Sequence, residues 1–111
     1  MLVILEIVDK VIVILENGVG VIVIFKSGYE ALVILVSVMW CLSVWERVGE
    51  VTAIYKSVHN VILIFESIDG VILAFRTVDE VVIILESEDE VHIVVGFQSV
   101  GEVIVISESA D

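Results

Sequence analysis

The chain has 111 residues, 59% of them hydrophobic, and its seventeen acidic and five basic side chains give a formal net charge of −12 at pH 7. This length suits one domain, predicted over residues 1–111, whose core needs neither a metal nor a disulfide. The charge argues against nucleic acid as a partner and against a polybasic membrane anchor, because both require clustered Lys and Arg.

The first ten residues, MLVILEIVDK, hold an apolar run that has no basic segment before it and that Glu6 interrupts, which is not the pattern of a signal peptide. The longest run without a charge, residues 31–45, is shorter than the roughly 20 residues of a membrane-spanning helix. It is also rich in Val and Ile, which favour strands. We therefore expect strands here and no transmembrane helix.

A ten-residue repeat runs along the chain. Its clearest copies are VIVILENGVG, VIVIFKSGYE, VTAIYKSVHN, VILIFESIDG and VVIILESEDE. Positions one to five are dominated by Val, Ile, Leu and Phe, which favour strands, whereas polar and turn-forming residues gather at positions seven, nine and ten. Ten residues are enough for one strand and one tight turn. The repeat therefore predicts an all-β chain.

The turns predict how these strands connect. Asp69-Gly70 is the clearest two-residue hairpin signal, while Asp79-Glu80 suits such a turn less well because Glu resists positive φ. With positions nine and ten as the turn, Val78 would lie opposite Val81. Each face of the sheet would then collect even positions from one strand and odd positions from the next, so both faces would be largely apolar.

The sequence therefore predicts an antiparallel up-and-down meander of about ten to eleven short strands, closed as a barrel or packed as layered sheets. A β-solenoid and propeller-like blades are the alternatives. The charges at position six count against a solenoid, because a coil of twenty residues would stack Glu46, Glu66 and Glu86 directly on one another.

The repeat is interrupted at two places. Residues 91–102, VHIVVGFQSVGE, contain two extra residues, which preserve the in-and-out alternation, and Gly96 is expected to supply a bulge or bend. At the second place, Met39 and Trp40 replace the polar turn. This apolar turn is either tucked under the sheet or a docking tip. Met39, Trp40 and Trp45 are therefore the predicted contacts with a partner or a membrane.

Motifs that carry chemistry are missing or incomplete. Gly18-Val19-Gly20 is interpreted as a turn, and GFQSVG around Ser99 lacks the spacing of a nucleophile elbow. His59 and His92 have no derivable shared site, and Cys41 is expected to be a buried small hydrophobe. The acidic run at residues 86–90 lacks the pattern of a calcium loop and is interpreted as a solvated hairpin tip. We expect no catalytic, cofactor-binding or metal-binding residues, and no enzyme.

Two hypotheses follow for function. The leading one is a non-enzymatic structural or self-assembling β-repeat protein whose partner is a copy of itself. The regularity of its repeat and the scarcity of functional polar groups indicate an artificial, designed sequence. The alternative is a β-barrel that binds an apolar ligand or enters lipid or detergent, which the excess of Val, Ile and Leu also favours.

Overall fold

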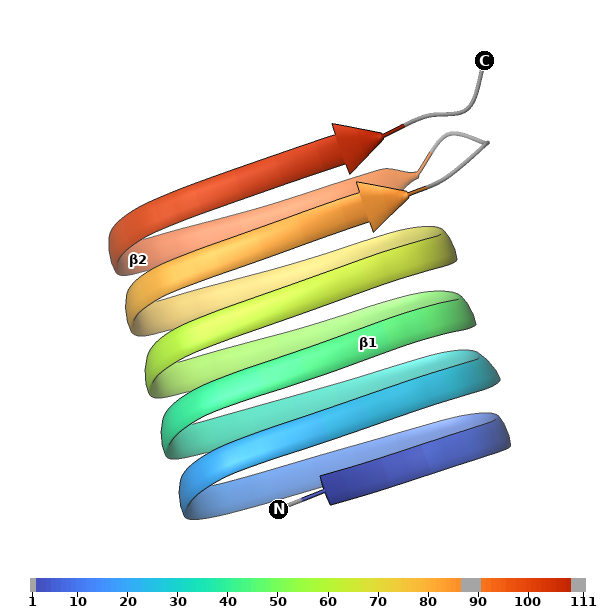
Figure 1. Ribbon diagram of the computed structural model, residues 1–111, viewed down its shortest axis with the longest axis horizontal. Helices are drawn as coiled ribbons and strands as arrows, with labels where there is room; N and C mark the ends of the chain where they lie inside the picture. Colours follow the sequence, from blue (N-terminus) through green and yellow to red (C-terminus); the bar gives the residue numbers. More distant parts are fainter. Residues whose placement is uncertain (1, 87–90, 109–111) are drawn as a thin grey trace.

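The computed structural model describes residues 2–86 and 91–108, with the backbone alone at residues 7 and 8. It contains two strands, β1 (Leu2–Glu86) and β2 (His92–Glu108). β1 does not stop at the end of each repeat. It winds upward as a flattened coil, which β2 continues (Figure 1). The prediction of an all-β chain is confirmed, because every described residue except Val91 is in a strand.

Strands in this coil lie parallel to one another. β1 and β2 pair in parallel, and contacts within β1 join residues that are twenty positions apart. Lys26 Nζ lies 3.9 Å from Glu6 Oε1, for example, and the rings of Phe25 and Trp45 stack with centroids 4.3 Å apart. One coil therefore contains two repeats. The predicted antiparallel meander, and the barrel built from it, are wrong, and the chain is a β-solenoid with two packed layers.

The side-chain alternation of a strand explains the core. Positions one, three and five of each repeat point inward, and positions two and four point outward. Position eight also points inward, where it fills the narrow end of the coil. The buried residues at this position are Val38, Val48, Val58, Ile68 and Val78.

Corners on one side of the coil fall at a different place from the predicted turns. Asn17, Ser37 and Ser57, each at position seven, have φ of 58°, 57° and 60°. This left-handed conformation redirects the chain, and short polar side chains adopt it more readily than bulky ones. The predicted hairpin turns at positions nine and ten are wrong: Gly70 pairs with His92, and Val78 pairs with Val100 rather than with Val81.

Stacked like charges do not prevent this coil, contrary to the prediction. The twenty-residue spacing does place Glu46, Glu66 and Glu86 in one column. Their side chains lie on the outer surface, where water and salt reduce the repulsion between neighbouring charges to about 1 kcal/mol or less. Each buried aliphatic or aromatic side chain contributes about 1.5–3 kcal/mol, so burial of the core outweighs the repulsion.

The spacing between stacked residues changes near the C-terminal end. From Gly70 and His92 onward, paired residues are 22 positions apart, so two extra residues enter between Glu86 and His92. The pairing runs without a break through Ala74 and Gly96, which means that the bulge predicted at Gly96 is absent. Residues 87–90, most of the predicted acidic tip, lie outside the described residues.

Two aromatic ladders run through the core, one on each layer. Trp45 stacks between Phe25 and Phe65, with centroid distances of 4.3 and 6.1 Å. On the opposite layer, Phe75 stacks between Tyr55 and Phe97, at 5.2 and 5.5 Å. Such stacking adds about 0.5–1.5 kcal/mol per pair to the burial of the rings. The ladders therefore help to keep successive coils in register.

Candidate functional site

The predicted contact residues do not form one surface. Met39 and Trp40 are 54% and 41% exposed at a corner of the coil, whereas Trp45 is fully buried in its aromatic ladder. The Trp40 indole covers Gly20 of the preceding coil, where an added Cβ would overlap the ring. Met39 and Trp40 are thus the exposed members of the set, and their binding of a partner stays a prediction.

One apolar surface is the outer side of the layer that faces the viewer in Figure 1, here called face A. Its residues occupy positions two and four of every second repeat. Those at position two are Leu2, Ile22, Leu42, Ile62, Val82 and Ile104. Those at position four are Ile4, Ile24, Val44, Ile64, Ile84 and Ile106. The outward side chain at each of these two positions is therefore Leu, Ile or Val.

The outer side of the other layer, here called face B, is less uniform. Its residues at position two are Ile12, Leu32, Thr52, Ile72 and Val94. Those at position four are Ile14, Ile34, Ile54, Ala74 and Gly96. Thr52 introduces a hydroxyl group, and Ala74 and Gly96 remove side-chain volume near the C-terminal end. Face B is apolar at its N-terminal half, but it is neither continuous nor even.

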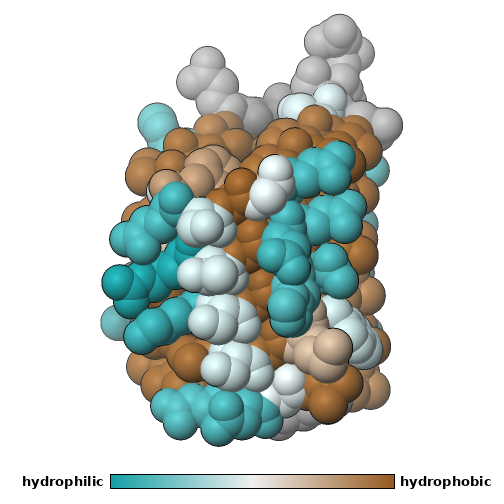
Figure 2. All heavy atoms as spheres, turned by 90° about the vertical axis from the view of Figure 1, so that its left-hand side faces the viewer, coloured by the Kyte–Doolittle hydropathy of each residue, from teal (hydrophilic) through white to brown (hydrophobic). Residues whose placement is uncertain are grey.

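Polar residues concentrate at the corners between the two faces. Figure 2 looks at one corner side, where hydrophilic residues stand in vertical columns with hydrophobic surface on both sides of them. In one column on this side, His59 Nδ1 lies 2.7 Å from Asp79 Oδ2, and both side chains are exposed. The two residues are twenty positions apart, and the sequence prediction missed the pair because it assumed hairpins.

Buried polar groups form a small cluster inside the central coil. Ser43 Oγ lies 3.4 Å from Cys41 Sγ, and both residues are buried. Burial raises the pKa of the Cys41 thiol to about 11, against the lowering effect of its hydrogen bond with Ser43. Burial also raises the pKa of Tyr55 well above 10, and nearby Cys41 adds to this while Ser43 opposes it.

This cluster is poorly suited to nucleophilic chemistry. The thiolate is the reactive form of cysteine, and a pKa near 11 leaves Cys41 protonated at neutral pH. The burial of Cys41 agrees with its predicted role as a small hydrophobe. Over the residues that the structure describes, no group of three or more His, Cys, Asp and Glu side chains could hold a metal ion.

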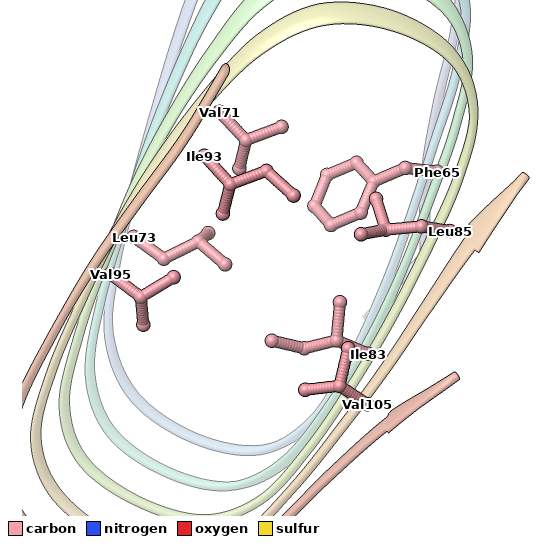
Figure 3. A pocket seen from close by; sticks show the side chains of 8 residues that line it. All are labelled: Phe65, Val71, Leu73, Ile83, Leu85, Ile93, Val95 and Val105. Atoms are coloured by element: carbon pink, nitrogen blue, oxygen red, sulfur yellow. The ribbon is translucent and has the colours of Figure 1, made fainter. Parts of the chain in front are cut away.

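An apolar cavity of about 60 Å³ lies between the last coils (Figure 3). Phe65, Ile83, Leu85 and Val105 point into it from one layer. The opposite layer contributes Val71, Leu73, Ile93 and Val95. The cavity is partly open at the end of the coil, where Ile93 and Val105 are 43% and 57% exposed, and an apolar cavity of about 150 Å³ is known to hold benzene. This cavity is less than half that size, so it cannot enclose a fatty acid or similar ligand.

Within the described part of the chain, no helix has the length and apolar character needed to cross a membrane. No protein-family model, curated protein or solved structure matches the chain. A proposal for function therefore depends on the arrangement of this chain's own residues. Face A stands out among its surfaces because its outward residues at positions two and four are all Leu, Ile or Val.

Proposed function

We propose that this protein is a non-enzymatic structural scaffold that assembles with copies of itself. The observation that carries this proposal is the outward row of large aliphatic side chains on its broad faces. Four isoleucines on these faces are between 41% and 67% exposed: Ile4, Ile12, Ile62 and Ile72. Exposing so many aliphatic groups to water is unfavourable, and packing against a second protein surface would bury them.

The architecture supports the same conclusion. Parallel sheets in proteins are normally covered on both sides, and in this coil only the inner side of each layer is covered. Monomeric proteins rarely expose contiguous apolar patches beyond about 300–600 Å². The negative charge of −12 keeps such copies dispersed until their apolar surfaces meet in the right geometry.

We also propose that the sequence is of artificial origin. Positions one to five repeat with little variation from one coil to the next. Such regularity is typical of a sequence chosen to form a structure. The alternative function, binding of an apolar ligand, has weaker support, because the cavity of about 60 Å³ is too small for all but the smallest molecules.

Light scattering coupled to size-exclusion chromatography tests the proposal directly. For a chain of 12.2 kDa, we expect a discrete assembly with a mass that is a multiple of this value, in buffer without detergent. The assembly should dissociate on dilution. A monomer that persists up to about 100 µM would contradict the proposal, because a scaffold that assembles should have a dissociation constant below that concentration.

A further inference from the structure

The two broad faces of the coil differ in a way that matters for assembly. All outward side chains of face A are Leu, Ile or Val, whereas face B contains Thr52, Ala74 and Gly96. In the position-four column of face B, the side chains shrink from Ile54 to Ala74 to Gly96 along the coil. Face A therefore offers an uninterrupted aliphatic surface, and face B does not.

We propose that face A is the self-assembly interface, and that it is covered by face A of a second copy in a symmetric dimer. This inference rests on the proposed function and assigns a surface to it. Two sheets with aliphatic side chains pack face to face at about 10 Å, as the layers of a β-sandwich do. A symmetric dimer uses the same patch twice, so one self-complementary face is sufficient.

The size of the face fits such a dimer. The molecule measures 37 by 27 Å across its broad side, or about 1,000 Å² with the polar corners included, and its aliphatic strip alone is about 460 Å². A standard interface buries about 800 Å² on each partner. The strand segment of about five residues makes the aliphatic part roughly 17 Å wide, and the corners on either side of it are polar. A hydrophobic centre inside a polar rim is the usual organisation of a protein interface.

The charges at the border of face A disfavour an anionic membrane as its occupant. The column at position six, next to this face, consists of Glu6, Lys26, Glu46, Glu66, Glu86 and Glu108. Lys26 lies 3.9 Å from Glu6, and the other carboxylates leave this border strongly acidic. Anionic lipid headgroups would be repelled there, since membrane surfaces attract basic segments. A second copy can be placed so that its face is buried while its carboxylates stay in water at the rim.

A matched pair of variants tests the assignment. Ile64→Lys places a charge at the centre of face A, and Ile54→Lys places the same charge on face B. Both isoleucines occupy position four of a central repeat and are partly exposed. We expect Ile64→Lys to weaken dimerisation by at least about 100-fold, because a lysine without a partner is costly to bury. Ile54→Lys should leave the dissociation constant within about threefold, as is usual for a residue outside an interface.

Circular dichroism shows whether each variant has kept its strands. Should Ile64→Lys fail to fold, Ile64→Thr keeps the β-branched shape and adds only a hydroxyl. This substitution should weaken the dimer by at least about tenfold. Each dissociation constant is measured by light scattering over a dilution series.

The other outcomes separate this inference from the proposed function. If the wild-type chain assembles and Ile64→Lys assembles as well, another surface joins the copies and the assignment of face A is wrong. If Ile54→Lys alone dissociates, face B is the interface. A monomeric wild-type chain would overturn both proposals. Flotation with phosphatidylcholine vesicles gives the last comparison: binding that Ile64→Lys abolishes would identify a lipid surface, and not a second copy, as the occupant of face A.

Discussion

Stacked residues in β1 and β2 have similar side chains but very different surroundings. Phe75 is 1% exposed, and its register partner Phe97 is 48% exposed. In the same way, Ile83 is 4% exposed and Val105 is 57% exposed. The earlier residue of each pair has a coil on both sides, whereas no described coil stacks beyond β2. Burial in this coil therefore depends on having neighbours above and below, and not on the residue type alone.

Truncation of the paired phenylalanines should produce the largest difference between these regions. We expect Phe75→Ala to lower the free energy of unfolding by about 3–5 kcal/mol, because it removes a buried ring from the middle of a ladder. Phe97→Ala should cost about 1–2 kcal/mol, since half of its ring is already in water. Urea unfolding of both variants measures the difference. Equal losses would mean that β2 is covered in solution.

A pH titration should reveal the buried polar cluster of the central coil. The pKa of Cys41 is about 11 in the folded protein and 9 in an ordinary thiol, so the unfolded chain loses this proton first. The contribution of the protonated Cys41 thiol to the free energy of unfolding is therefore complete below pH 9. Between pH 9 and 11 the free energy of unfolding should fall by about 1.4 kcal/mol per pH unit. Tyr55, whose pKa is also raised, should add to the fall above pH 10.

Cys41→Ser provides the control for this titration, because a serine hydroxyl does not ionise in this range. Urea midpoints measured at intervals from pH 8 to 11 should decline less steeply for the variant, in line with the linkage between ionisation and folding. An identical decline in both proteins would show that the thiol titrates normally and that the central coil admits water.

Substitution of two glycines by alanine should produce the smallest of these differences in stability between β1 and β2. A Cβ on Gly49, in the central part of the coil, would lie 2.8 Å from the carbonyl oxygen of Tyr29, whereas one on Gly96 of β2 meets nothing within 4 Å. Gly49→Ala should therefore destabilise the protein by about 1–2 kcal/mol, and Gly96→Ala should change its stability by less than about 0.5 kcal/mol. Thermal unfolding measures both. A Gly49→Ala variant as stable as the wild type would mean that successive corners are further apart than in this structure.

Sequence patterns predicted part of this architecture and missed the rest for identifiable reasons. The strand composition was sufficient for the all-β prediction, and the presence of aliphatic residues at both odd and even positions indicated two apolar faces. The direction of the strands was missed, because the turn residues were interpreted as hairpins. A better signal was present: aromatic residues recur twenty positions apart, at Phe25, Trp45 and Phe65.

The candidate surface was only partly predictable. Met39 and Trp40 were expected at a tip and do lie exposed at a corner, but Trp45 faces the core because it occupies position five. Faces A and B could not be separated under the hairpin assignment, which mixed even positions of one strand with odd positions of the next. The stacking of every second repeat is what places all the uniformly aliphatic segments on one side.

The sequence by itself determined the secondary structure, the ten-residue period and the apolar character of both strand faces, because these follow from local preferences and from the two-residue alternation of a strand. Only the tertiary structure decided that the strands are parallel, which residues share a face and where the chain turns. These features depend on the path of the chain at each corner. A hairpin would keep the next strand in the same sheet, whereas the corners of this coil place it in the opposite layer. That choice is settled by contacts between residues twenty positions apart, such as the Phe25–Trp45 stack, which no short stretch of sequence contains.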